Sequence, residues 1–174
     1  MSDALAALKA RQGAGARYDA PNAPADDLLL ARRGTAYFAR KLNELSDSEL
    51  DTRDRRRIIA TVSYDARALA VMMAGARTGH WPEEPRFEAS AKEIALGANL
   101  PARALRHLFH HTEVHLNVEW RDLPEAAWDC AMPIGGTPRS TPALRAKTVW
   151  FAALDLGNGG RLNDLPAAMR QLRA

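Results

Sequence analysis

Apolar residues recur along the chain at steps of three and four, the spacing that places them on one face of an α-helix. Four such stretches predict long helices, at 28–45, 55–77, 101–123 and 141–156. At least two of the connections between them are long, and little of the chain shows the alternation typical of a strand. We therefore predict an all-α fold, a four-helix bundle with long connections.

Residues that cap helices stand at several of the predicted starts. Asp26 or Asp27 is available to cap the first long helix, and Ser46 with Glu49 three positions later forms a capping-box pattern. Thr141, followed by a proline, predicts a side-chain cap at the start of the fourth helix.

Glycine and proline mark the connections between these helices. Gly79 is placed to end the second long helix, and Gly157 to end the fourth. Shorter helices are predicted at 88–98 and 165–172. The segment 128–141 contains prolines and a Gly-Gly pair, which predicts a loop or a short irregular hairpin before the last long helix.

The segment before the first long helix differs in composition. It is rich in Ala, Gly, Pro and Asp, and beyond a short helix predicted from Asp3 to Arg11 it lacks a helical period. We predict an N-terminal arm over 1–27, packed on a surface or a partner, and a single helical domain over 28–174. A chain of 174 residues is long enough for one domain with its own core.

Composition narrows the class of protein further. The single cysteine, Cys130, cannot form an internal disulfide, and no run of about 18 apolar residues lacks a charge, so we expect a cytoplasmic protein without a membrane partner. The 24 basic and 21 acidic residues are interspersed, apart from a cluster at Arg53 to Arg57 that we interpret as the solvated first turn of a helix. We expect no nucleic-acid partner.

Most of the histidines lie in the third predicted helix. They are His107, His110, His111 and His115. A spacing of four places His107 beside His111, and His111 beside His115, where imidazoles can chelate Zn²⁺, Ni²⁺ or Cu²⁺. A solvated helix flank is the alternative interpretation. His115 lies nearest the apolar stripe, so His111 and His115 are the candidate metal ligands of this helix.

Asp65 is the most unusual acidic residue of the chain. It shares the register of the apolar positions of the second helix, so it is expected to face the bundle interior. A carboxylate there has to be paired, metal-bound or exposed to a cavity. An ion pair with Arg67 or Arg145 is the structural alternative to a catalytic role. For Asp155, near the end of the fourth helix, we expect a local cap or ion pair.

Three stretches resemble the N-terminal domain of the mycothiol-dependent maleylpyruvate isomerases, relatives of the DinB-like four-helix bundles. They are ATVSYDARALAVMMAGARTG at 60–79, VEWRDLPEAAWDC at 118–130 and RAKTVWFAALDLGNGGRLNDLP at 145–166. The third is the most specific, because its arginine, Val-Trp pair, Asp-Leu-Gly and Asp-Leu-Pro keep the family's spacing. The resemblance covers nearly all of the chain from about residue 28 and implies a DinB-like bundle.

In that family a zinc ion is held by a histidine on the second helix and by a glutamate and a histidine four residues apart on the fourth. The matched motifs place these positions at Thr61, Thr148 and Ala152, none of which is the expected ligand. The resemblance thus implies a cavity whose zinc site is lost, with a low-molecular-weight thiol as a possible cofactor. Asp65, one turn after Thr61, would then form a relocated acid–base pair or metal site with His111 or His115; the predicted catalytic residues are Asp65 and His115.

Two functions from different classes remain open. The resemblance implies a thiol-dependent cis–trans isomerase or transferase acting on a small unsaturated acid. The loss of the zinc ligands favours instead a zinc-free, non-catalytic bundle that binds a small molecule or a partner. A metal-binding protein built on the histidines of the third helix is a third hypothesis. In each case we expect a small-molecule ligand and a homodimer formed through a helix face and the N-terminal arm.

Overall fold

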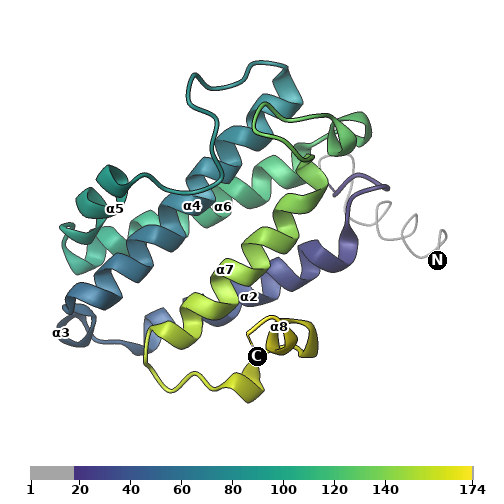
Figure 1. Cartoon of the computed structure of the whole chain (residues 1–174). Coiled ribbons are helices and arrows are strands. Elements are labelled where there is room, and N and C mark those ends of the chain that lie inside the picture. Colours follow the sequence, from purple (N-terminus) through teal and green to yellow (C-terminus); the bar gives the residue numbers. More distant parts are fainter. Residues whose placement is uncertain (1–17, 174) are drawn as a thin grey trace.

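A computed structural model describes residues 18–173, and the regular structure within them is entirely helical (Figure 1). The long helices are α2 (Ala25–Glu44), α4 (Arg53–Thr78), α6 (Ala102–Asp122) and α7 (Thr141–Asp155). The shorter elements are α3 (Asp47–Leu50), α5 (Ala91–Ala98), α8 (Ala167–Gln171) and the 3₁₀ turns η1 (Glu125–Asp129), η2 (Pro138–Ser140) and η3 (Leu162–Asp164). The predicted all-α class is confirmed. The short helix expected at 3–11 lies outside the described residues.

The bundle consists of two packed helix pairs, α4 with α6 and α2 with α7 (Figure 1). Their facing sides are built from the apolar positions that the sequence spacing identified, and α5 packs on the outside of α4. Gly34 permits the close approach of α2 to α7, because a Cβ at this position would lie 2.6 Å from a methyl group of Val149. The candidate site lies at the interface between α4 and α7.

The helix ends agree in part with the predicted caps. Ser46 and Glu49 form the expected capping box, and Gly79 ends α4 in the left-handed conformation at φ 76°. The cap predicted at Asp26 or Asp27 is wrong, because α2 starts earlier, after Pro24, and both aspartates lie in its first turn. In the first turn, the negative charges of the two aspartates still interact favourably with the helix dipole.

The segment between α6 and α7 forms two 3₁₀ turns joined by a tight turn, with no strand pairing in this described stretch. The loop alternative predicted for 128–141 is therefore the one observed. The side-chain cap predicted at Thr141 is wrong: Thr141 is fully buried, and its hydroxyl donates to the carbonyl of Pro138 at 2.7 Å while it accepts from the indole of Trp120.

The described part of the N-terminal arm packs on the bundle, as expected. Asp19 forms two hydrogen bonds with the Arg32 guanidinium at 2.6 and 2.7 Å, and Asn22 bonds the carbonyl of Glu125. Asp155 forms the expected local ion pair near the end of α7, with Arg173 at 2.6 Å. Among the described helices, α4 is long and apolar enough to span a membrane, but most of that stretch is buried in the bundle, as in a core helix.

Candidate functional site

A buried arginine joins α7 to α4. Arg145 is 1% exposed, and its Nη1 donates a hydrogen bond to the backbone carbonyl of Val62 at 2.7 Å. Its Nη2 is also buried and has no hydrogen-bond partner among the described residues. A guanidinium in this position is costly unless its charge is compensated and its donors are used. The Nη2 group is therefore a donor directed into the protein interior and still available.

Two carboxylates compensate the charge of Arg145. Burial lowers the pKa of Arg145 to about 10, and the charges of Asp65 on α4 and Glu113 on α6 oppose this change. Burial in turn raises the pKa of Asp65, an effect that the Ala89 N–H and the Arg145 charge reduce. The pKa of Glu113 is raised by burial as well, against His110 and Arg145. The buried Asp65 and the partly buried Glu113 therefore both hold a proton more readily than usual.

The Asp65 carboxylate is bound by a backbone N–H of the loop after α4, in addition to the effect of the Arg145 charge. The carboxylate is 8% exposed, and its Oδ1 accepts a hydrogen bond from the backbone N–H of Ala89 at 2.7 Å. The loop after α4 returns over the helix and is fixed there by the capping box of Ser90 and Glu93 at the start of α5. The inward position predicted for Asp65 is confirmed. No direct ion pair of Asp65 with Arg67 or Arg145 forms among the described residues, although the charge of Arg145 still acts on Asp65 and lowers its pKa.

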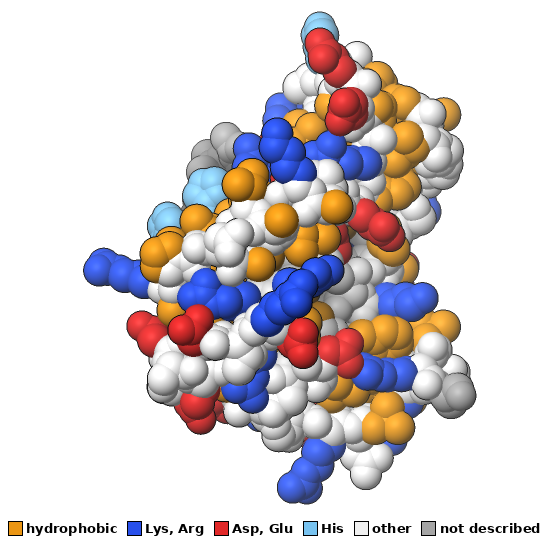
Figure 2. Space-filling view, turned by 60° about the vertical axis from the view of Figure 1, so that its left-hand side comes forward, with side chains coloured by type: hydrophobic (Ala, Val, Ile, Leu, Met, Phe, Trp, Pro, Cys, Tyr) orange, Lys and Arg blue, Asp and Glu red, His pale blue; other side chains and the backbone are white. Residues whose placement is uncertain are grey.

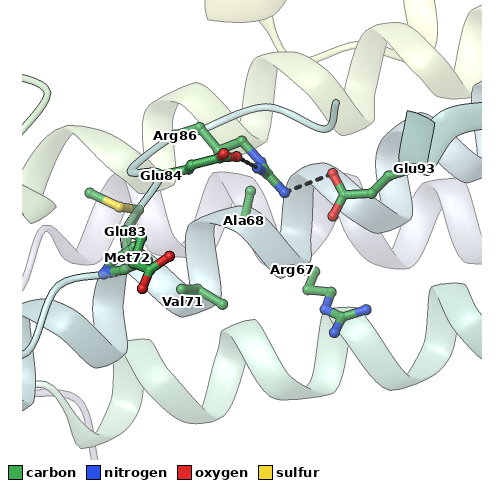
Figure 3. A pocket seen from close by; sticks show the side chains of 9 residues that line it. Arg67, Ala68, Val71, Met72, Glu83, Glu84, Arg86 and Glu93 are labelled. Atoms are coloured by element: carbon green, nitrogen blue, oxygen red, sulfur yellow. Dashed lines mark hydrogen bonds and ion pairs between the residues drawn. The ribbon is translucent and has the colours of Figure 1, made fainter. Parts of the chain in front are cut away.

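A groove of about 370 Å³ runs along α4 beneath this loop (Figure 3). Arg86 of the loop crosses it and bonds Glu93 at 2.9 Å and Glu84 at 3.4 Å, while Arg67 lies on the opposite side (Figure 3). Glu93 lines the groove and caps α5 together with Ser90, next to Ala89, whose N–H binds Asp65, so the groove lies beside the loop that holds the buried carboxylate.

The three positions that the family resemblance predicts for zinc ligands lie on α4 and α7, the helices that Arg145 joins. Thr61 lies one turn before Asp65 on α4, and Thr148 and Ala152 follow Arg145 at helical spacing on α7. The bond from Arg145 to Val62 sets this face of α7 against α4 beside Thr61. The Thr148 hydroxyl donates to the Leu144 carbonyl at 3.2 Å, the local bond that threonine makes within a helix.

The candidate histidines lie elsewhere. The His115 side chain is 42% exposed, and its Nε2 is 3.6 Å from Glu119, whereas His111 lies on the exposed face of α6. Asp65 and His115 share no contact in the described part of the molecule, so the structure does not bring the two predicted catalytic residues together. Residues 18–173 contain no group of three or more His, Cys, Asp or Glu side chains placed to hold a metal.

Sequence reasoning missed the central role of Arg145 and did not identify Glu113. A signal for Arg145 was present, because it is a charged residue in a helix that is apolar on nearly all sides. Glu113 gave no such signal, since acidic residues are common on amphipathic helices. Cys130, the single cysteine of the chain, is half-buried and free.

Two solved structures are similar to this arrangement. The crystal structure of the mycothiol-dependent maleylpyruvate isomerase superposes with a TM-score of 0.75, at 33% sequence identity over 84% of this chain and 65% of that chain. A mutant of that isomerase in which a histidine is replaced by alanine matches with the same TM-score and coverage at 32% identity. This chain belongs to the family of that isomerase. Searches of protein-family models and of curated proteins found no match.

Membership of this family does not by itself assign the activity of the complete isomerase to this chain. The chain spans about two thirds of the length of the isomerase, just under that fraction, so the remaining third of that protein has no counterpart in the comparison. The similarity supports a function related to that of the isomerase. The identity of the reacting groups has to come from the residues that stand in this chain.

Proposed function

We propose that this chain is a zinc-independent member of the isomerase family that binds a small organic molecule between α4 and α7. The observation that carries the proposal is the donor set at the three family positions: Thr61, Thr148 and Ala152. Zinc is bound in proteins by imidazole, thiolate or carboxylate, and alanine offers no donor at all. The Thr148 hydroxyl is already committed to Leu144. The residues present do not fit the metal.

The neighbouring carboxylate does not replace the missing ligands. Asp65 lies one turn from Thr61, but its Oδ1 accepts from Ala89 and it has no imidazole or second carboxylate grouped with it for a three-ligand site in the described chain. The site therefore supports binding through hydrogen bonds. The unpartnered Nη2 of Arg145 is the donor for an acceptor oxygen of the ligand, and the threonine side chains and Ala152 supply a small, weakly polar lining.

A specific observation favours a second candidate, the family reaction carried out without zinc. The pKa values of Asp65 and Glu113 are both raised, chiefly by burial, so these groups hold a proton to a higher pH than a fully exposed carboxyl group does and can act in proton transfer. In this hypothesis a low-molecular-weight thiol adds to the double bond of a small unsaturated acid, the adduct rotates about the resulting single bond, and the thiol is eliminated. The carboxyl group of Asp65 donates the proton in the addition and takes it back in the elimination. A cis–trans isomerase or transferase activity that depends on thiol and survives a chelator would identify it.

The decisive experiment restores the ligands that the family uses. In a His111→Ala background, which removes both α6 histidine pairs that are spaced by four residues, the variant Thr61→His/Thr148→Glu/Ala152→His should bind one zinc ion per chain, measured by elemental mass spectrometry after dialysis. The double variant Thr61→His/Thr148→Glu is the matched control and should retain much less zinc. Stoichiometric zinc in the His111→Ala parent, or no gain in the triple variant with its fold intact, would refute the proposal.

Ligand binding itself is tested with small carboxylic acids, saturated and unsaturated, in a thermal-shift assay. We expect stabilisation by at least one of them, and loss of this shift in Thr148→Leu, which fills the site without removing Arg145. We further propose that the protein acts in the cytoplasm as a homodimer, without a nucleic-acid or membrane partner; size-exclusion chromatography with light scattering measures the dimer.

A further inference from the structure

The exposed face of α6 carries three histidines in a single row. His107, His111 and His115 follow one another at intervals of four residues, so each stands about one helical turn above the last. Their ring centroids are 6.3 Å apart for the first pair and 6.5 Å apart for the second. Together with His110 and Val114 they line a shallow surface groove of about 400 Å³. Exposed histidine side chains are visible in pale blue at the left edge of Figure 2.

These imidazoles are available as ligands. Within the described residues, the rings of His107 and His111 contact their neighbours in the row and form no hydrogen bond or ion pair. Imidazole nitrogen is a strong ligand for Cu²⁺, Ni²⁺ and Zn²⁺, and two histidines four apart on a helix form a chelating pair. His107 and His111 are exposed and the His115 side chain is 42% exposed, so the rings can change rotamer to bring two nitrogens onto one ion.

Glu119 favours one of the two pairs. It lies one turn beyond His115, with its Oε1 3.6 Å from the histidine Nε2, and it is itself held by two hydrogen bonds from Arg77 at 3.1 and 3.2 Å. A carboxylate behind a ligating histidine orients the ring and increases its basicity. The pair of His111 and His115 therefore has a fixed outer partner that the pair of His107 and His111 lacks.

We propose that this row binds one divalent transition-metal ion per chain, through His111 together with His115 or, alternatively, His107. Both pairs need His111, so the two sites exclude each other and the stoichiometry is one. No third protein ligand joins them in the described chain, and the remaining coordination positions are left to water or to a small ligand. Cu²⁺ binds more tightly than Ni²⁺ or Zn²⁺, following the general order of affinities for nitrogen ligands.

The row offers its own matched controls. His110 lines the same groove but has no histidine four residues away on either side, and it lies 3.6 Å from Glu113 instead. His111→Ala removes both pairs, whereas His107→Ala and His115→Ala each leave one pair. The order of the effects therefore distinguishes chelation from a general contribution of exposed histidines.

The test is isothermal titration calorimetry of tag-free protein with CuCl₂ and NiCl₂, which measures affinity and stoichiometry. Electron paramagnetic resonance of the copper form identifies the ligand atoms. We expect one Cu²⁺ per chain with nitrogen hyperfine structure. His111→Ala should weaken binding by more than the roughly tenfold loss typical of an outer-partner mutation, with smaller losses for His115→Ala and His107→Ala and none for His110→Ala. Circular dichroism confirms that each variant is folded.

Three outcomes would overturn the proposal. They are wild-type protein that binds neither ion, copper binding that His111→Ala leaves unchanged, and a loss in His110→Ala as large as that in His111→Ala. Because none of these variants touches Thr61, Thr148 or Ala152, the result is independent of the function proposed for the site between α4 and α7.

Discussion

Arg145 of α7 donates a hydrogen bond to the backbone carbonyl of Val62 on α4 at 2.7 Å, deep within the bundle. Helical carbonyls normally accept from an amide four residues ahead, and a second donor uses the remaining lone pair of the oxygen. The contact joins the two helix pairs, because α4 belongs to one pair and α7 to the other. It also fixes a guanidinium on which the charges of both Asp65 and Glu113 act.

Replacing this arginine should be costly. Arg145→Met leaves the buried Asp65 and the partly buried Glu113 without their neighbouring cation, and we expect the free energy of unfolding in urea to fall by about 3–5 kcal/mol. Arg57→Met, at an exposed position of α4, is the control and should change it by less than about 0.5 kcal/mol. Adding Asp65→Asn to Arg145→Met should recover part of the loss. Equal stability of Arg145→Met and wild type would show that the contact is dispensable.

The buried carboxyl groups predict a specific dependence of stability on pH. The pKa of Asp65 is raised by burial, so between its unfolded value near pH 4 and its folded value the native state binds more protons than the unfolded state, and stability falls as pH rises. Asp65→Asn keeps an oxygen for the Ala89 amide but does not ionise. Relative to wild type, this variant should therefore gain stability as the pH is raised from about 4 to 7.

A variant of opposite sign checks this result. The pKa of Asp129 is lowered, chiefly by its hydrogen bonds with Arg139, so Asp129→Asn should lose stability relative to wild type as the pH rises from acid values through the unfolded pKa near 4, with little further change above about pH 5. Glu113→Gln should follow Asp65→Asn, because burial raises its pKa too. Urea unfolding at several pH values measures all three. A pH-independent difference for Asp65→Asn would contradict the cause assigned here.

The long helices could be predicted from the sequence because their signal is local. Apolar spacing, the Ser46 capping box and Gly79 each depend on residues within one or two turns, and these features appear as expected. The inward position of Asp65 follows from the same spacing. The hydrogen-bond partner of Asp65 could not be predicted in this way, because the amide of Ala89 is 24 residues away and reaches Asp65 only where the intervening loop folds back.

The pairing of Asp65 with a histidine of α6 was beyond what helix spacing can decide. Spacing gives the face of a helix but not the rotation of that helix against its neighbours, and α6 packs on α4 with His111 and His115 on its outer side. Glu113 was missed, and Arg145 was considered only as a possible ion-pair partner of Asp65, for the related reason that charge compensation depends on three helices at once. The cap at Thr141 was predicted from the proline that follows it. The residue that donates to its hydroxyl, Trp120, lies on α6, and spacing within one helix does not reveal such a partner.

The close approach of α2 to α7 predicts that a single added methyl group is unfavourable. In Gly34→Ala the new Cβ would lie 2.6 Å from Val149 and 2.7 Å from the ring of Trp150, both in packed positions. Overpacking costs about 1–3 kcal/mol, which exceeds the gain of up to about 1 kcal/mol in helix propensity, so the protein should be less stable. Thermal unfolding measures the change, and Gly34→Ala/Val149→Ala should recover the part due to Val149. Increased stability of Gly34→Ala would show that the helices separate freely.

The hydrogen bond between Trp120 and Thr141 gives a prediction that separates shape from polarity. The indole N–H of Trp120 donates to the Thr141 hydroxyl at 3.0 Å, and both residues are buried. Thr141→Val keeps the shape of the side chain but leaves the buried indole N–H of Trp120 without an acceptor. We therefore expect a loss of about 1–3 kcal/mol in the free energy of unfolding. Thr141→Ser keeps the acceptor and removes one methyl group, which should cost about 1 kcal/mol. If Thr141→Ser proved the more damaging of the two, the methyl contact rather than the hydrogen bond would hold α6 to α7 at this point.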